Sequence, residues 1–195
     1  MKSTDNEIVR RVIDGDSRAY AELVDRHKDK AMTLAVRMLK DRREAEEALQ
    51  DAFVRAFRGL PAFEWKASFS TWFYRIVFNV CSSRLSRRGD TAVLSIDQEN
   101  DDELTMEIRS QDDEPDKELE MKEFNSIVRS EIDNMEAAYA SILTMFFLQE
   151  MSYEEIISVT GLPLGTVKNR LFRARMQLRR AVLRHFSATN ILVNL

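Results

Sequence analysis

Apolar residues recur three and four positions apart over most of this chain, a spacing that places them on one side of an α-helix. The pattern predicts successive helices over residues 4–14, 17–40, 41–60, 119–133 and 136–149. Within residues 41–60 charged side chains fill the opposite side, and the apolar positions are Ala45, Ala48, Leu49, Ala52, Phe53, Ala56 and Phe57. The chain is therefore predicted to be built from amphipathic helices.

The composition supports an all-α class. Five glycines and three prolines in 195 residues are far below average usage, which favours long helices with few turns. The lone Cys81 excludes an internal disulfide, and no Cys/His cluster offers a zinc site, so we expect no metal and no cofactor. His27 lies beside an apolar stripe and is predicted to be a packing or partner residue. No run approaches the ~20 apolar residues of a membrane span, and no signal peptide begins the chain, so we expect a cytoplasmic protein without membrane insertion.

Residues 151–180 predict a helix, a tight turn and a second helix. Ser152 is the expected N-cap, and Gly161 the residue that ends the first helix in a left-handed conformation. In the second helix Val167, Leu171, Ala174 and Leu178 share one side. The other side is basic, with Lys168, Arg170, Arg173, Arg175, Arg179 and Arg180. A glycine-containing turn before a basic helix is typical of a helix-turn-helix, whose second helix enters the major groove. A helical hairpin with a solvated basic side is the structural alternative.

Residues 62–88 combine aromatic and basic side chains. This stretch holds seven of the chain's seventeen aromatic residues, together with five Lys or Arg residues. Ser68 or Ser70 is expected to cap a helix that runs to about Arg88. Rings interleaved with cations suit single-stranded nucleic acid, because bases stack on the rings while the cations meet phosphates. Most of these rings fit a core equally well, and the best candidates for exposure precede the helix: Phe63, Trp65 and Phe69.

Charged residues are unevenly distributed along the chain. Residues 152–186 carry seven basic and two acidic residues, whereas residues 90–118 carry twelve acidic and two basic residues. The acidic stretch has no long helical period and few aromatics, so we expect a flexible linker at residues 89–118. The prediction is therefore two small helical domains, 1–88 and 119–186, followed by a tail at 187–195.

Three motifs in this order resemble an extracytoplasmic-function (ECF) sigma factor, a branch of the sigma-70 family of bacterial transcription initiation factors. They are EAEEALQDAFVRAF at 44–57, ASFSTWFYRIVFNVCSSRLSRR at 67–88 and YEEIISVTGLPLGTVKNRLFRAR at 153–175. The resemblance implies that the two domains are regions 2 and 4 of that family. It also implies three partners: core RNA polymerase (β′ clamp helices and β subunit), promoter DNA and an anti-sigma factor.

The resemblance further implies a role for each motif. Segment 44–57 would bind core polymerase through Glu47, Gln50, Asp51, Phe53 and Arg55. Segment 62–88 would melt and recognise the −10 promoter element through Lys66, Ser68, Phe69, Asn79, Arg84, Arg87 and Arg88. The helix-turn-helix at 152–175 would contact the −35 element through Thr166, Lys168, Asn169 and Arg173, with Arg170 and Arg175 on phosphates.

The leading hypothesis is a binding protein, not an enzyme, which directs core polymerase to −10/−35 promoters of stress or envelope-response genes. The alternative is a stand-alone helix-turn-helix regulator that binds duplex DNA. The aromatic segment discriminates between them, since such a regulator has no use for stacking on single strands. A hydrolase or transferase lacks support, because no Gly-rich phosphate loop, metal cluster or Ser/His/Asp constellation is present.

Overall fold

The computed structural model describes residues 3–90 and 118–193, with side chains at 3–90 and 124–185. The predicted linker falls mostly on residues 91–117 and lies outside the described residues. The first half contains α1 (Asp5–Ile13), the 3₁₀ turn η1 (Ser17–Ala19), α2 (Tyr20–Leu39), α3 (Arg42–Gly59), the 3₁₀ turn η2 (Leu60–Ala62) and α4 (Phe69–Arg87). The second half contains α5 (Glu118–Asn134), α6 (Ala137–Leu143), the π-helical turn η3 (Thr144–Leu148), α7 (Tyr153–Thr160) and α8 (Leu164–Val193). The described residues include no strand, and the all-α prediction is confirmed.

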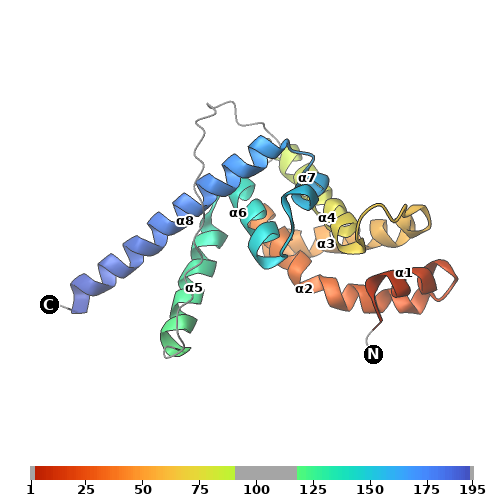
Figure 1. The fold of residues 1–195 in the computed structure, drawn as a ribbon, viewed down its shortest axis with the longest axis horizontal. Helices are drawn as coiled ribbons and strands as arrows, with labels where there is room; N and C mark the ends of the chain where they lie inside the picture. Colours follow the sequence, from red (N-terminus) through yellow and green to blue (C-terminus); the bar gives the residue numbers. More distant parts are fainter. Residues whose placement is uncertain (1–2, 91–117, 194–195) are drawn as a thin grey trace.

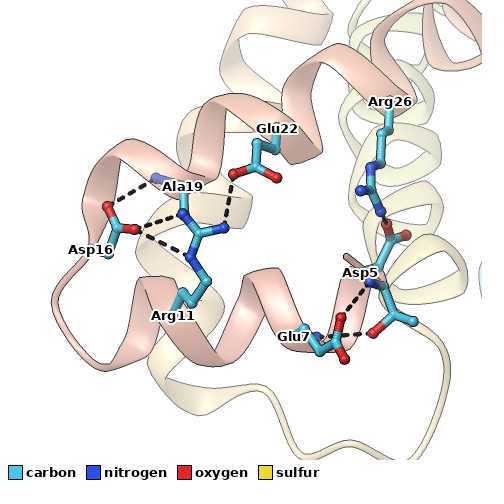
Figure 2. Close-up of polar contacts among 8 residues, drawn as sticks. Asp5, Glu7, Arg11, Asp16, Ala19, Glu22 and Arg26 are labelled. Atoms are coloured by element: carbon cyan, nitrogen blue, oxygen red, sulfur yellow. Dashed lines mark hydrogen bonds and ion pairs between the residues drawn. The ribbon is translucent and has the colours of Figure 1, made fainter. Parts of the chain in front are cut away.

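Side-chain caps fix where the helices begin. Thr4 and Glu7 form a reciprocal capping box at α1, in which each side chain accepts a hydrogen bond from the other residue's backbone N–H (Figure 2). Asp41 caps α3 and Ser68 caps α4, so Ser68 and not Ser70 is the cap. Each cap satisfies backbone N–H groups that have no partner within the helix.

Polar contacts tie α1 to α2. The Arg11 guanidinium donates to Asp16 and to Glu22, and Arg26 donates to Asp5 (Figure 2). His27 Nε2 lies 2.8 Å from the other oxygen of Asp5. The His27 ring also lies beside Phe69 and two further aromatic rings of α4. His27 is therefore a packing and hydrogen-bonding residue, as the sequence predicted.

Alanines allow α3 to approach α2 and α4 closely. Ala45, Ala48, Ala52 and Ala56 are all buried, as the apolar pattern predicted. Between them Phe53 stacks on Phe73 of α4 with ring centroids 4.6 Å apart. Small side chains shorten the distance between helix axes. The larger aromatic rings of α4 complete the core next to these alanines.

The second half departs from the sequence prediction at two points. The apolar run at 136–149 is not one α-helix: it changes to a π-helical turn at Thr144, where Gln149 N–H donates to the Thr144 carbonyl five residues back. The Thr144 hydroxyl donates to the Ala140 carbonyl and accepts from Arg37, and such side-chain bonds compete with the regular backbone ladder. Further along, α8 continues to Val193, through most of the expected tail.

The two halves pack against each other. Helix α7 lies on α4, and α6 lies on α2 (Figure 1). One continuous cluster of buried apolar residues runs through both, from Ile8 in α1 to Ala174 in α8. The sequence predicted two helical domains but gave no indication of this contact.

We predict that the Asp5 contact contributes to stability in a pH-dependent way. The hydrogen bond from His27, opposed by partial burial and aided by Arg26, holds the pKa of the Asp5 carboxyl below its usual value of about 3.9. Because the folded pKa is lowered, this stabilisation is complete above about pH 4 and is lost as pH falls through the folded pKa. Asp5→Asn should lower the free energy of unfolding by about 1–2 kcal/mol at pH 7.

The measurement is thermal unfolding followed by circular dichroism, at neutral pH and at about pH 2.5, below the usual pKa. The difference between Asp5→Asn and the unmodified chain should shrink at the lower pH. Asp25→Asn is the control, since its ion pair with Lys28 is exposed and should contribute less than about 1 kcal/mol. An equal effect of the two substitutions at pH 7 would refute the assignment.

Candidate nucleic-acid interface

The helix-turn-helix predicted at 152–175 is present in α7 and α8. Ser152 and Glu155 form a capping box at the start of α7, so the acidic first turn lies at the positive end of the helix dipole. Gly161 ends α7 with φ 73°, in the left-handed conformation that favours glycine. The Thr160 hydroxyl then accepts from the Leu162 N–H and fixes the turn. Val167, Leu171 and Ala174 of α8 are buried against it, and Ile157 packs half-buried on the same core.

Most of the expected duplex-binding side chains lie on the accessible side of α8. Lys168 is exposed, and Thr166, Asn169 and Arg173 are half-buried. Arg170 is a correction, because only 1% of this residue is exposed. Its position three residues after Val167 turns it toward the interior, so in this arrangement it cannot meet a phosphate. The basic face is therefore narrower than the charge pattern suggested.

Aromatic rings hold two of these cations. The Arg175 guanidinium lies 5.1 Å from the Phe146 ring centroid and 4.8 Å from that of Phe147. Lys168 Nζ lies 6.0 Å from the ring of Tyr153 in α7. Cation–π contacts of this kind are attractive and restrict the side chain. The structure thus links Arg175 to the π-helical turn, a connection that the helical period did not predict.

The loop before α4 exposes only one of its three candidate rings. Phe63 is buried, and Phe69 is 1% exposed between His27 and Phe73. Phe69 is therefore a core residue and not a DNA contact, because it is the first residue of α4 and turns into the first half's core. Trp65 is 41% exposed. Lys66 and Ser68 are exposed beside it, with Lys66 paired to Glu64 at 2.8 Å and Ser68 accepting from the Thr71 N–H.

The polar side chains near the end of α4 differ in whether they are exposed or paired with another group. Asn79 and Arg87 are exposed. Arg84 reaches Glu47 of α3 at 3.5 Å, and Arg88 pairs with Glu44 and donates to the Leu39 carbonyl. A paired guanidinium must exchange or share its partner before it binds a phosphate. Asn79 and Arg87 are thus the most accessible of the predicted −10 residues of α4.

The expected polymerase-docking segment forms one exposed side of α3. Glu47 and Gln50 are exposed, and Arg55 donates two hydrogen bonds of 2.9 Å to Asp51. That pairing lowers the pKa of the Asp51 carboxyl, so it is ionised at neutral pH. Phe53 faces inward, where its ring meets Phe73 and Tyr20. Val54 and Phe57 lie one and two turns after Gln50 and are exposed apolar residues. Phe57 was predicted to belong to the apolar stripe of this helix, whereas Val54 was not.

Polar contacts made by two buried residues, Arg37 and Thr71, join the two halves. Arg37 of α2 is 6% exposed and donates to Asp133 at 2.8 Å and to the Thr144 hydroxyl at 3.0 Å. Thr71 of α4 donates to Glu155 of α7 at 2.8 Å. Glu155 therefore satisfies the start of α7 and also contacts the first turn of α4. The sequence offered no signal for these pairs, because the partners are 84 to 107 residues apart.

The described residues contain no group of three or more His, Cys, Asp or Glu side chains placed to bind a metal ion. Within the same residues, none of the helices has the length and apolar character needed to cross a membrane.

Comparison with known proteins gives one family match in each half of the chain. The family descriptions Sigma-70 region 2 and Sigma-70, region 4 match residues 23–91 and 126–178. The chain is 34% identical to the RNA polymerase sigma-H factor of Pseudomonas aeruginosa, over 91% of this chain and 93% of that protein. It is 32% identical to the ECF RNA polymerase sigma factor SigW of Bacillus subtilis, over 88% and 93%, and to the ECF RNA polymerase sigma-E factor of Escherichia coli, over 88% and 91%.

Solved structures agree in fold. The sigma factor RpoE in complex with the anti-sigma factor NepR from Bartonella quintana gives a TM-score of 0.59 at 20% identity, covering 84% of this chain and 96% of that one. CnrH in complex with the cytosolic domain of CnrY gives a TM-score of 0.58 at 19% identity, over 90% and 95%. With sequence relatives above 30% identity along most of their length, the chain belongs to the ECF sigma factors of the sigma-70 family.

Proposed function

We propose that this chain binds core RNA polymerase and directs it to promoters that carry a −10 and a −35 element. The observation that carries the proposal is the presence of two differently built nucleic-acid surfaces in one chain. The basic helix α8 follows a helix-turn-helix and suits duplex DNA. The loop before α4 and the exposed end of α4 combine an open ring with cations and suit single strands. The protein is then a binding factor in the cytoplasm, and bond-making chemistry belongs to the polymerase.

The exposed side of α3 is the proposed polymerase-docking surface. It combines the polar side chains of Glu47 and Gln50 with the exposed apolar Val54 and Phe57. A mixture of exposed apolar residues and rim charges is typical of a protein interface. Phe53 contributes from beneath by fixing the helix on α4, and Asp51 and Arg55 supply a preformed ion pair.

Promoter binding requires the two halves to separate. Elements at −10 and −35 are about 25 base pairs apart, or about 85 Å along the duplex at 3.4 Å per base pair. Helices α4 and α7 are in direct contact in this structure. One molecule cannot hold that contact and occupy both elements, so the arrangement described here precedes promoter binding.

An anti-sigma factor is the proposed regulator. Both of the solved structures named above contain a bound partner. RpoE is in complex with the anti-sigma factor NepR, and CnrH is in complex with the cytosolic domain of CnrY. A partner that holds the halves of this chain together would prevent simultaneous occupation of the two elements. Purification of the protein from its own host should yield a stoichiometric complex with such a partner.

Run-off transcription with purified core polymerase over a promoter library tests the proposed function. We expect initiation only when this protein is added, from templates that share two separated sequence elements. The alternative, a stand-alone helix-turn-helix regulator, predicts duplex binding without core polymerase and no initiation from any template.

The docking proposal predicts that Gln50→Ala combined with Asp51→Ala weakens binding to core polymerase by at least about tenfold, or about 1.4 kcal/mol. The helical circular dichroism should stay unchanged, because both side chains lie outside the core. Asp25→Ala combined with Lys28→Ala removes an exposed ion pair from α2 and is the matched control. Equal affinity of the two double variants for core polymerase would contradict the docking surface.

The −35 proposal predicts different behaviour for two arginines of α8. Arg173→Ala should cost about 1–3 kcal/mol at one base pair and relax specificity there. Arg179 is exposed further along the helix, so Arg179→Ala should weaken binding evenly across sequences and lower the salt dependence, as for a phosphate contact. Affinities over a promoter library at two salt concentrations make the comparison. Identical profiles for the two variants would remove the distinction.

A further inference from the structure

The π-helical turn η3 is held at both of its ends by α2 of the other half. At its start the Thr144 hydroxyl accepts a hydrogen bond from the buried Arg37 at 3.0 Å. Directly after its last residue, the Gln149 side-chain amide donates to the Lys30 carbonyl at 3.4 Å. Lys30 and Arg37 lie two turns apart on one side of α2. Turns of this kind are rare, and those that occur often lie at functional sites. The two contacts indicate that α2 maintains this one.

The backbone bonds of the turn differ from those of a regular helix. Gln149 N–H donates to the Thr144 carbonyl, five residues back, and Met151 N–H donates to the Met145 carbonyl, six residues back. In an α-helix each of these carbonyls would accept from the N–H four residues later. A π-helical turn holds one residue more than an α-helical turn. A return to α-helical bonding would therefore rotate the residues after Thr144 by about 100° relative to α6.

Two rings carried by this turn hold the Arg175 guanidinium of α8. Its distances from the ring centroids of Phe146 and Phe147 are 5.1 and 4.8 Å, and Phe147 stays 54% exposed in this position. The Arg175 Nε–H is buried and finds no hydrogen-bond acceptor among the described residues. Lys168, two turns earlier on the same side of α8, is exposed. Arg175 is thus held back from solvent with a donor left unused.

Packing alone does not explain an arginine at position 175. An apolar side chain would cover the same two rings without burying an unpaired N–H. The cation–π contacts offset part of that cost while the rings stay in place. Once the rings move, the Nε–H of Arg175 needs an acceptor, and a phosphate oxygen supplies both the acceptor and a negative charge.

We propose that the π-helical turn couples separation of the two halves to DNA binding by α8. While α2 holds the turn, Phe146 and Phe147 retain Arg175. When α2 leaves, the turn returns to α-helical bonding, the rings rotate away, and Arg175 binds a phosphate of the −35 duplex. The proposal rests on the proposed function and makes one of its DNA contacts conditional on opening of the molecule.

The first test follows the Arg175 Nε–H group by NMR in the full-length free protein. Stacking on two rings should shift this proton resonance upfield, and burial should slow its exchange with water. Arg37→Met fills the same space but donates no hydrogen bond, and Thr144→Val removes the acceptor with little change in shape. Both variants should move the resonance to an ordinary arginine position and speed its exchange. Arg175→Lys, which lacks this group, identifies the resonance.

The second test measures binding of the full-length free protein to a duplex that carries the −35 element, at several low salt concentrations. Arg37→Met should bind about tenfold more tightly than the unmodified chain, the effect of one charged hydrogen bond. Its salt slope should be steeper by about 0.9, the value for one phosphate. In an Arg175→Ala background Arg37→Met should bring no gain. Arg179→Ala, at an exposed arginine one turn later, is the matched control background, in which the gain should persist.

The outcomes separate the coupling from general loosening of the molecule. A gain in affinity that survives Arg175→Ala overturns the coupling, because Arg175 then does not carry the gain. An Arg175 Nε–H resonance that is unshifted in the unmodified chain, or that neither variant moves, overturns it as well. If the resonance moves as predicted but no form of the protein binds the −35 duplex, the change in the turn stands. The promoter function, and with it the role of Arg175 on DNA, is then refuted.

Discussion

The contacts of the buried Arg37 with the exposed Asp133 and the buried Thr144 join the two halves of the molecule. They fix α2 to the end of α5 and to the π-helical turn, and that turn in turn places Phe146 and Phe147 under Arg175 of α8. A second polar contact, between Thr71 and Glu155, fixes the helix-turn-helix on α4. Removing one partner of a buried charge is costly, because the other is left without compensation. Water can compensate each of these groups once the halves separate, so the interface is better suited to opening than a purely apolar one.

Local features of the fold could be predicted from the sequence. The cap at Ser152, the left-handed Gly161 and the buried stripe of α8 all follow from neighbours within one or two turns. The all-α class and the position of the helix-turn-helix follow from the same short-range patterns. Motif resemblance added the family, which the comparisons confirmed.

Features that depend on distant residues could not be predicted. A helical period places Phe69 and Arg170 at definite angles but does not say which neighbour covers them, and both are buried. Phe69 packs against His27, 42 positions earlier. The same limit applies to Arg37, whose partners lie in the second half. The exposure of Trp65 was predicted, but its left-handed backbone and its contact with Arg10, 55 positions earlier, were not.

The burial of individual cations refines the functional account. A count of basic residues suggests a uniform DNA-binding face, yet Arg170 is interior, Arg175 is stacked on rings and Arg88 is paired with Glu44. Accessible polar side chains remain at Lys168 and Arg179 in α8, and at Lys66 and Asn79 near α4. These two groups belong to different halves of the chain. The halves must therefore be apart for both groups to reach their promoter elements at the same time.

A distance measurement between the halves tests this requirement most directly. Spin labels on cysteines introduced at the exposed Lys28 and Gln177 would report it, because burial raises the pKa of the native Cys81 thiol to about 12 and keeps that thiol unreactive. The account predicts a single distance in the free protein, set by the packed halves, and a distance longer by tens of ångströms, on the order of the 85 Å between elements, in promoter-bound holoenzyme. An unchanged distance in a transcriptionally competent complex would contradict it.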